Sequence, residues 1–265
     1  MTDAAAWQRA ADPARRLGHA VEFHASIGST SDRARELLAA GREGIAVVAD
    51  LQTAGRGRRG RAWESPPGVN LMVSVAFRPS LDPAALGLLG LAAALAARSA
   101  CVTAAGGRPL WLRWPNDLVA ADGAKLAGVL VETALVEGRP ADAVVGIGIN
   151  ANWRRADMPP ELVERATSLC ELTGTDVDRV ALLSLLLGAL DGELRALEDG
   201  RSPVPRAREA DALAGRQVRV DTGSEVLGGR SLGIDEDGAL LLETHGERRA
   251  LHAGEVVAVR EALPA

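Results

Sequence analysis

Lysine is almost absent from this 265-residue sequence. Lys125 is the only lysine among 30 basic residues, tyrosine does not occur, and aromatic residues make up 3% of the chain. Modules that bind single-stranded RNA stack its bases on aromatic side chains, so this composition disfavours that class. A lysine retained among so many arginines indicates a role for a compact ammonium group, which a broad planar guanidinium does not fill. The alternative is chance survival on the surface.

Cysteines and long apolar runs are also scarce. Cys101 and Cys170 are the only cysteines, which gives neither a disulfide framework nor a metal-ligand spacing, and we expect both to be buried. The apolar stretch 86–97 has twelve residues, whereas a membrane-spanning helix needs about 20. The N-terminus mixes acidic and basic residues without an apolar segment, so no signal peptide is predicted. We therefore expect a cytoplasmic protein without a membrane partner.

Strands and helices are predicted to alternate along the first 200 residues. A hydrophobic fraction of 47% with 25% charged residues is typical of a globular protein. Apolar runs bounded by glycine or turn residues predict strands at 21–24, 44–50, 70–77, 110–114, 125–135 and 143–150. Capping residues and helical periodicity predict helices at 4–17, 31–40, 82–100 and 180–197. Mixed strands covered by helices indicate an α+β (mixed α/β) domain.

The composition changes after about residue 212. From Gly215 onward, short β-like runs are separated by the turn sequences DTG, EDG and HGE, which predicts a small β-barrel of about 50 residues. Residues 201–209 form the predicted linker. We expect an N-terminal helical extension (1–20), a main α/β domain (21–212) and a C-terminal domain (213–265).

The stretch GRGRRGRAW (55–63) concentrates positive charge in a chain whose formal net charge is -5. Four arginines and three glycines in seven residues suit neither a helix nor a strand. Backbone N–H groups of a glycine-rich loop and flanking arginines bind carboxylate or phosphate oxygens. The segment is therefore an anion clamp that orders on binding, an RGG-like nucleic-acid segment or a solvated surface loop. An isolated basic run in acidic surroundings favours the clamp.

Two further stretches favour an anionic ligand. In RWPNDL (113–118), Asn116 and Asp117 follow a predicted strand around a proline turn. A carboxamide beside a carboxylate reads the edge of a heterocycle and holds a hard cation such as Mg²⁺, although an Asn-Asp turn that bonds its own backbone is the simpler alternative. Lys125 begins a predicted buried strand, where its ammonium needs a counter-charge. A bound carboxylate or phosphate would supply one.

GRGRRGRAW, RWPNDL and KLAGVLVE (125–132), in this order and spacing, resemble the signature of the biotin protein ligases. GSTS (28–31), Gln52, GIGIN (146–150) and ATSL (166–169) fit the same family. The resemblance runs from about residue 26 through the core, and the terminal barrel is similar to the family's SH3-like C-terminal domain. Ser31 stands where the family often has Asn, and Arg113 where it often has Lys.

The resemblance implies a biotin/lipoate-ligase-type catalytic domain that uses biotin, ATP and Mg²⁺. Biotin and ATP would give biotinyl-5′-AMP and pyrophosphate, and a lysine of a biotin carboxyl carrier protein, an acyl-CoA carboxylase subunit, would then accept the biotin. Lys125 and Arg58 would be the catalytic residues. The residues implied at the biotin site are Ser29, Thr30, Ser31, Gln52, Arg56, Gly57, Arg58, Lys125 and Gly128.

The same resemblance implies an ATP site with separate roles for its members. Arg61 would meet the phosphates, Trp63 would close over adenine, and Asp117 would lie near phosphates and Mg²⁺. The implied ATP-binding residues are Arg61, Trp63, Asn116, Asp117 and Asn150. Arg59 receives no role and is expected to be a solvated charge.

Three alternatives remain beside a biotin ligase. A biotin-responsive repressor would need an N-terminal DNA-binding domain, and the 25 or so residues before the family match are too few for one, so no DNA partner is expected. Lipoate ligases and octanoyltransferases share the catalytic fold, but none of the four histidines follows a glycine-rich loop, and both cysteines lie outside such a motif. The RNA-binding module lacks its aromatic platforms.

Overall fold

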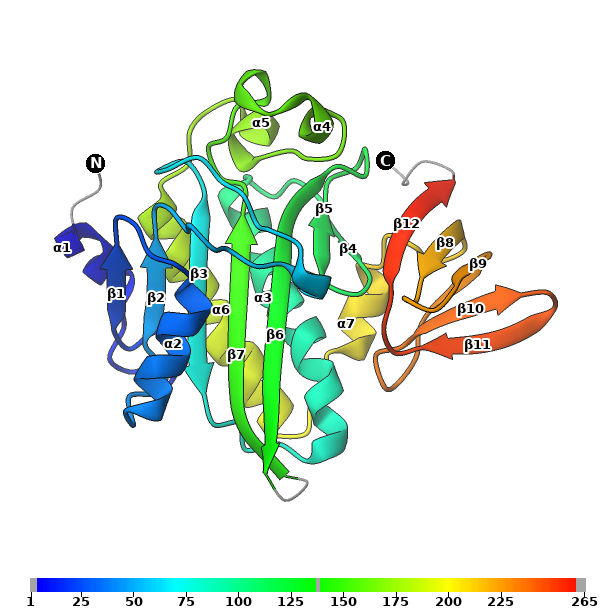
Figure 1. Ribbon diagram of the computed structural model, residues 1–265, viewed down its shortest axis with the longest axis horizontal. Helices are drawn as coiled ribbons and strands as arrows, with labels where there is room; N and C mark the ends of the chain where they lie inside the picture. The colour runs from blue at the N-terminus through cyan, green and yellow to red at the C-terminus, as the bar shows by residue number, and fades with distance from the viewer. Residues whose placement is uncertain (1–3, 137–138, 261–265) are drawn as a thin grey trace.

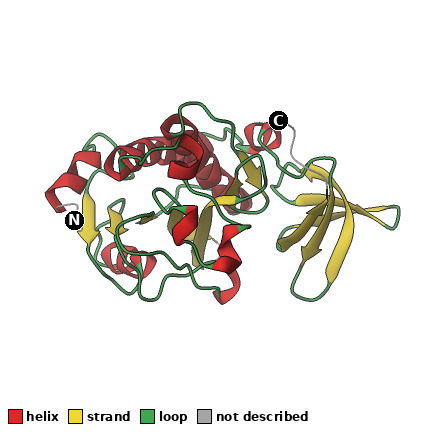
Figure 2. Ribbon diagram, turned by 90° about the horizontal axis from the view of Figure 1, so that it is seen from above, coloured by secondary structure: helices red, strands yellow, loops and turns green. Residues whose placement is uncertain are grey.

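The computed structural model describes residues 4–136 and 139–260 and contains two β-sheets (Figure 1). The outermost residues of the predicted N- and C-terminal regions, 1–3 and 261–265, lie outside the described residues. Figure 2 shows the smaller sheet set to one side of the α/β part, with chain passing between the two. The mixed α/β architecture and the all-β C-terminal region are both as predicted.

The larger sheet has seven strands in the order β1-β2-β3-β7-β6-β5-β4. Only β1 and β2 pair in parallel, and the other neighbours are antiparallel. Its strands are β1 (Val21–His24), β2 (Ala46–Ala49), β3 (Leu71–Phe77), β4 (Trp111–Arg113), β5 (Asp117–Val119), β6 (Lys125–Val136) and β7 (Arg139–Ile149). All six predicted strands are present. The three-residue strand β5 was missed, because it is too short to show periodicity.

Helices cover both faces of this sheet. In Figure 1, α2 (Thr30–Ala39) lies in front of the sheet, and α3 (Leu89–Ala104) and α6 (Arg179–Glu198) lie behind it. The Asp178 carboxylate accepts hydrogen bonds from Val180 N and Ala181 N, which satisfies two free donors at the start of α6. The remaining helices are short: α1 (Ala4–Trp7), α4 (Pro160–Val163), α5 (Leu169–Thr173) and α7 (Val204–Glu209).

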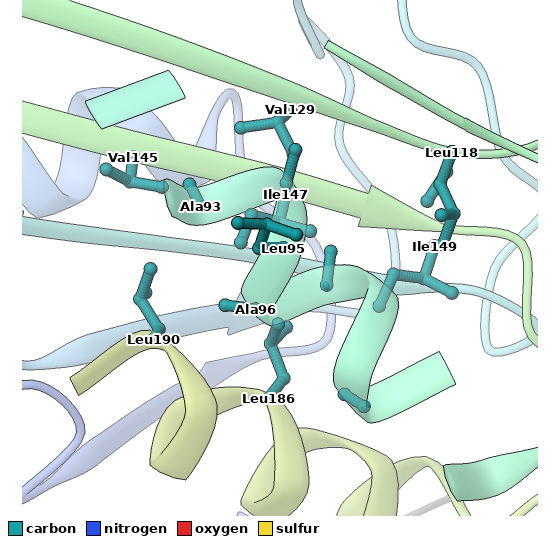
Figure 3. Packing of buried hydrophobic residues seen from close by; sticks show 14 of the residues in the cluster. Ala93, Leu95, Ala96, Leu118, Val129, Val145, Ile147, Ile149, Leu186 and Leu190 are labelled. Carbon is teal, nitrogen blue, oxygen red and sulfur yellow. The ribbon is translucent and has the colours of Figure 1, made fainter. Parts of the chain in front are cut away.

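The main core lies where α3 is packed between the sheet and α6 (Figure 3). Small side chains such as Ala93 and Ala96 let α3 approach its neighbours closely, and Ile147 of β7 and Leu186 of α6 fill the space on its two sides. The helical stretch from Pro83 to Ala104 is long and apolar enough to cross a membrane by length and composition alone. The part that is α-helical, α3, is packed in the core, whereas the 3-10 helix Pro83–Leu88 before it has no buried residue. Cys101 and Cys170 are buried, as expected.

Two of the predicted elements are wrong. The helix predicted at 4–17 consists only of α1 and a 3-10 turn that ends at Ala10. Pro13 disfavours helical backbone at Asp12, the residue before it. Asp12 Oδ1 instead accepts a hydrogen bond from Ala14 N. The predicted linker 201–209 contains α7, whose Val204 and Ala207 are fully buried against the core.

The C-terminal sheet has five antiparallel strands in the order β11-β10-β9-β8-β12. They are β8 (Gln217–Asp221), β9 (Val226–Ile234), β10 (Leu240–Thr244), β11 (Glu247–Leu251) and β12 (Glu255–Arg260). Several side chains connect this sheet to the α/β part, and two of them bond to its backbone near β9 and β10. Trp114 Nε1 donates a hydrogen bond to Gly238 O at 3.1 Å, and Arg208 Nε donates one to Ile234 O at 2.6 Å.

Asp211 lies at the junction between the two parts. Its Oδ1 accepts a hydrogen bond from Leu213 N at 2.8 Å, whereas its buried Oδ2 accepts none. Burial raises the pKa of this carboxyl to about 6 from an ordinary value of 3.8, against the opposing effects of the Leu213 hydrogen bond and the Arg216 charge. The folded protein therefore holds this proton more tightly than the unfolded chain. The resulting stabilisation is complete below about pH 4 and is lost as the pH rises through about 6.

We predict that Asp211→Asn removes this pH dependence while keeping the Oδ1 acceptor. Relative to the wild type, the variant should gain about 1–3 kcal/mol in free energy of unfolding between about pH 4 and about pH 7. Urea denaturation of both proteins across this range measures the difference. A difference that stays constant with pH would contradict the assignment.

Candidate functional site

A cavity lined by about thirty residues lies between the larger sheet, the start of α2 and the first residues of β12. The arginine loop (55–63) crosses it, and its short 3-10 turn lies in front of β6 in Figure 1. The start of α2, the strands β3, β5, β6 and β7, and residues 254–256 of the C-terminal region also line it. The cavity is therefore built from segments that are far apart in the sequence.

One end of the cavity carries neutral polar groups. Thr30 and Ser31 begin α2, and Gln52 follows β2 beside them. Gln52 Oε1 accepts hydrogen bonds from Thr30 N at 2.8 Å and Thr30 Oγ1 at 3.0 Å. The Ser74 hydroxyl of β3 lies 2.8 Å from Thr30 Oγ1 and 3.0 Å from Ser31 Oγ. This network presents uncharged donors and acceptors. Ser74 was missed because nothing in an apolar strand marks a single serine as a site residue.

The other end is cationic and centres on Asp117. Lys125 Nζ lies 2.6 Å from Asp117 Oδ1, and Arg113 Nη2 lies 3.0 Å from its Oδ2. The antiparallel pairing of β5 with β6 brings the two strands together, with Asp117 opposite Gly128. We expected a bound anion to supply the counter-charge of Lys125. In this structure Asp117 supplies it, and one carboxylate is shared by two cations.

The arginine loop is held by partners on both sides of the cavity. Arg56 forms a bidentate pair with Asp32 of α2, with N–O distances of 2.5 and 2.8 Å, and this contact lowers the pKa of the Asp32 carboxyl. Arg58 donates to Gly254 O at 3.1 Å and, more weakly, to Asn116 Oδ1 at 3.5 Å. Burial and then the nearby Arg59 lower the pKa of the Arg58 guanidinium.

Arg59 and Arg61 contact the C-terminal sheet. Arg59 Nη1 lies 3.4 Å from Asp221 Oδ2, and Arg61 is paired with Glu255. Arg59 is exposed, as expected of a solvated charge, and it also has an acidic partner that the sequence did not predict. Its partner is far away in the sequence, so no local pattern indicates the pair.

Trp63 lies against two strand glycines. A Cβ atom built on Gly148 would lie 2.5 Å from the indole, and one built on Gly128 would lie 3.1 Å from it. Lys125 Nζ is 5.5 Å from the centre of the same ring, within range of a cation–π contact. Trp63 Nε1 is buried without a hydrogen-bond partner. The glycines leave a bare sheet surface that accepts a flat ring.

Two predicted site residues do not line the cavity. Ser29 is buried at the start of α2. Asn150 is also buried, and its Nδ2 donates to Thr167 O at 3.0 Å and Lys125 O at 3.4 Å. In this structure Asn150 therefore supports the backbone that carries Lys125. The other predicted residues, from Thr30 to Gly128, are brought together around the cavity.

Carboxylates do not form a metal cage at this site. Among the described residues, no group of three or more His, Cys, Asp or Glu side chains is placed to hold a metal ion. Both oxygens of Asp117 face cations, as described above. The arrangement suits a ligand with a neutral polar end and a carboxylate end, next to a second anion that meets the loop arginines.

Comparison with known proteins agrees with this arrangement. Residues 24–150 match the Biotin/lipoate A/B protein ligase family, and residues 214–258 match the Biotin protein ligase C terminal domain. The biotin--[acetyl-CoA-carboxylase] ligase of Mycobacterium tuberculosis is 34% identical over 243 residues, which cover 89% of this chain and 88% of that protein. The bifunctional ligase/repressor BirA of Escherichia coli is 36% identical over 236 residues, covering 87% of this chain and 71% of that protein.

A solved structure has a similar fold over nearly the whole chain. The biotin protein ligase from Aquifex aeolicus in complex with biotin and ATP superimposes with a TM-score of 0.77 at 31% identity, covering 91% of this chain and 98% of that one.

The close contact between Trp63 and Gly148 leads to a testable prediction. Gly148→Ala places a methyl group where the ring lies, so we expect the indole to leave the sheet while the free energy of unfolding changes by no more than about 1 kcal/mol. Acrylamide quenching of tryptophan fluorescence should increase, because Trp7, Trp114 and Trp153 are buried and the half-buried Trp111 is unchanged by the substitution.

The matched control is Gly228→Ala in β9, where a Cβ atom meets nothing within 4 Å. Its quenching should equal that of the wild type. Unchanged quenching in Gly148→Ala would show that the ring does not lie on this strand.

Proposed function

The chain belongs to the biotin protein ligase family, and we propose that this cavity activates biotin with ATP and passes it to a carrier protein. The observation that supports this most directly is the division of one cavity into a neutral polar end and a cationic end beneath the arginine loop. A ureido ring needs uncharged donors and acceptors, whereas a carboxylate and a triphosphate need cations. The complex of the Aquifex aeolicus relative with biotin and ATP gives independent support.

The first step joins two anions. A carboxylate oxygen of biotin forms a bond to the α-phosphorus of ATP, and the bond from that phosphorus to the bridging oxygen breaks, releasing pyrophosphate. Repulsion between the anions and the charge that moves to pyrophosphate oppose the step. Lys125 and Arg58 weaken the repulsion and stabilise the moving charge, because they place fixed positive charge at the reacting phosphoryl group. Lys125 bridges the biotin carboxylate and the α-phosphate. When these anions bind, its contact with Asp117 weakens.

The biotin end is assigned to the neutral network. Thr30, Ser31 and Gln52 contact the ureido ring and its flank, with Ser74 completing the set from β3. Ser29 supports this end from the start of α2. Arg56, Gly57 and Arg58 meet the valeryl carboxylate and the adenylate phosphate, and Gly128 lets the ligand approach β6 closely.

The nucleotide end is assigned to the loop and the β4–β5 turn. Arg61 binds the ATP phosphates, and Trp63 moves off the strand glycines to close over adenine. Asn116 offers its carboxamide to the adenine edge, next to the phosphates near Asp117. The resemblance implies an adenine contact for Asn150 as well. Because Asn150 is buried and bonds the Lys125 carbonyl, we propose that it positions Lys125 instead of contacting adenine directly.

Mg²⁺ enters with ATP in this proposal. Asp117 does not fit a ready-made metal site, because both of its oxygens face cations. Mg²⁺ in nucleotide sites is held mainly by phosphates and water with one or two carboxylates, so Asp117 is proposed only as a neighbour of the metal. When bound, the ion would neutralise triphosphate charge.

The second step transfers biotin to a protein. The amine of a carrier lysine attacks the acyl carbon of biotinyl-5′-AMP, an amide forms and AMP leaves. The closed loop keeps water from the mixed anhydride until the carrier arrives. We propose that this partner is a biotin carboxyl carrier protein of an acyl-CoA carboxylase. We further propose a cytoplasmic location without a DNA or membrane partner. The proposed domains are an N-terminal extension (1–20), a catalytic domain (21–212) and an SH3-like domain (213–265). The name of the Mycobacterium tuberculosis relative supports the carrier.

The experiment that tests the activity compares three acids. The purified protein is incubated with MgATP and biotin, lipoate or octanoate, and acyl-adenylates are identified by mass spectrometry. Biotinyl-5′-AMP should form, and neither of the other adenylates should. Lipoyl-AMP in its place would assign the chain to the lipoate ligases, and no adenylate with any acid would refute the proposal.

Replacing Lys125 tests its role in the chemical step. Lys125→Ala should slow adenylate formation by about 10²–10³-fold, because a charge aimed at the transition state is lost. The fold should survive, since Arg113 still pairs with Asp117. Lys125→Arg restores charge without the compact geometry and should recover only part of the rate. A rate for Lys125→Ala close to that of the wild type, measured by rapid quench, would exclude the assignment.

A further inference from the structure

The arginine loop contacts the C-terminal sheet at three points. Arg58 donates to the Gly254 carbonyl, Arg59 lies by Asp221, and Arg61 is paired with Glu255. Residues 254–256 also line the cavity. The C-terminal sheet is thus part of the site and holds the loop that crosses it.

Asp221 and Glu255 are direct neighbours across two strands. Asp221 ends β8 and Glu255 begins β12, and the two residues are partners in the antiparallel pairing of these strands. Like charges directly opposite each other on one face of a sheet are destabilising. Arg59 and Arg61 offset this repulsion by placing one guanidinium against each carboxylate. The C-terminal sheet therefore presents a doubly negative site that the loop neutralises.

The turn after β8 also directs Asp221 at the loop. Asp221 Oδ1 accepts a hydrogen bond from Gly223 N at 2.7 Å, which leaves Oδ2 for Arg59. Gly223 has φ of +98°, and a Cβ atom there would lie 3.1 Å from Arg59 Nη2. The bare backbone at this position leaves room for the guanidinium.

Carboxylate and phosphate oxygens bind arginine in the same way, through charge-assisted hydrogen bonds to its planar group. A carboxylate pair that faces two loop arginines therefore occupies the donors that a polyphosphate would use. We propose that Asp221 and Glu255 are positioning residues that hold the arginine loop across the cavity, and that the phosphates of ATP compete with them for Arg59 and Arg61. The competition with ATP rests on the proposed function, whereas the closure of the loop does not.

The proposal predicts opposite effects on loop closure and on nucleotide affinity. Removing the two carboxylate charges frees the loop in the ligand-free protein. The same change removes a competitor of ATP, so the KM for ATP falls while kcat changes little. The KM for biotin should change less, because Arg56 and Lys125 have their counter-charges on Asp32 and Asp117 within the α/β part.

The test uses Asp221→Asn/Glu255→Gln in the full chain. Both replacements keep the shape of the side chain, and the carboxamide introduced at position 221 retains an oxygen acceptor for Gly223 N. The matched control is Glu225→Gln, which removes one carboxylate charge from the same sheet, where the partner is Arg249 (3.2 Å) and not an arginine of the loop.

The first readout is limited trypsin digestion without ligand, with mass spectrometry of the fragments. Cleavage after Arg56, Arg58, Arg59 or Arg61 should be about three- to tenfold faster in the double variant, the range expected for two partly exposed ion pairs, and unchanged in the control. Raising the salt concentration should accelerate cleavage of the wild type toward the double variant, because screening weakens the same pairs. Equal loop cleavage in all three proteins would overturn the proposal.

The second readout is the KM for ATP in biotinyl-5′-AMP formation. A KM about three- to tenfold lower in the double variant, with kcat nearly unchanged, supports competition with phosphate. An unchanged or higher KM would overturn it. If faster loop cleavage were found in a protein that makes no adenylate with biotin, loop closure would stand and the proposed function would fail, so the two failures are distinguishable.

Discussion

The ion pair between Lys125 and Asp117 joins the two strands on which the site is built. Lys125 begins β6 and Asp117 begins β5, and the side chains meet 2.6 Å apart at the cavity floor. Arg113 shares the same carboxylate, so a single acidic group balances two cations. A partly buried cation without a partner is costly. The pair with Asp117 therefore stabilises the ammonium at this position in the ligand-free protein.

The same balance extends across the cavity. Arg56 is paired with Asp32, Arg59 with Asp221 and Arg61 with Glu255, so these loop arginines have carboxylate partners on both sides of the site. This explains why an acidic protein concentrates positive charge in a glycine-rich loop. The charge is neutralised locally in the ligand-free protein, and in the proposed function anionic ligands replace these carboxylates as the loop orders around them.

The sequence predicts most of the elements because their signals are local. Apolar runs identified six strands of the larger sheet, and Asp178 marked the start of α6. The motifs also identified residues that meet in one cavity although they are separated by up to about a hundred positions. Their individual roles in binding and chemistry stay predictions.

What the sequence does not predict depends on distant pairing. Ser74 joins the neutral network only because β3 passes beneath α2, and Arg59 finds Asp221 only because the C-terminal sheet folds back on the loop. Asn150 belongs to a matching motif, yet its carboxamide bonds buried backbone. The short elements α7 and β5 are not predicted for a related reason. They have too few residues to show a hydrophobic periodicity, and burial in the folded protein stabilises them.

A crystal structure with a non-hydrolysable sulfamoyl analogue of biotinyl-5′-AMP would test the central claim most directly. We expect the ureido ring within hydrogen-bond distance of Thr30, Ser31 and Gln52, and the group that replaces the phosphate within about 3.2 Å of Lys125 Nζ. Trp63 should have left Gly148 for the adenine ring. An analogue bound outside this cavity, or one whose linking group does not contact Lys125, would contradict the account.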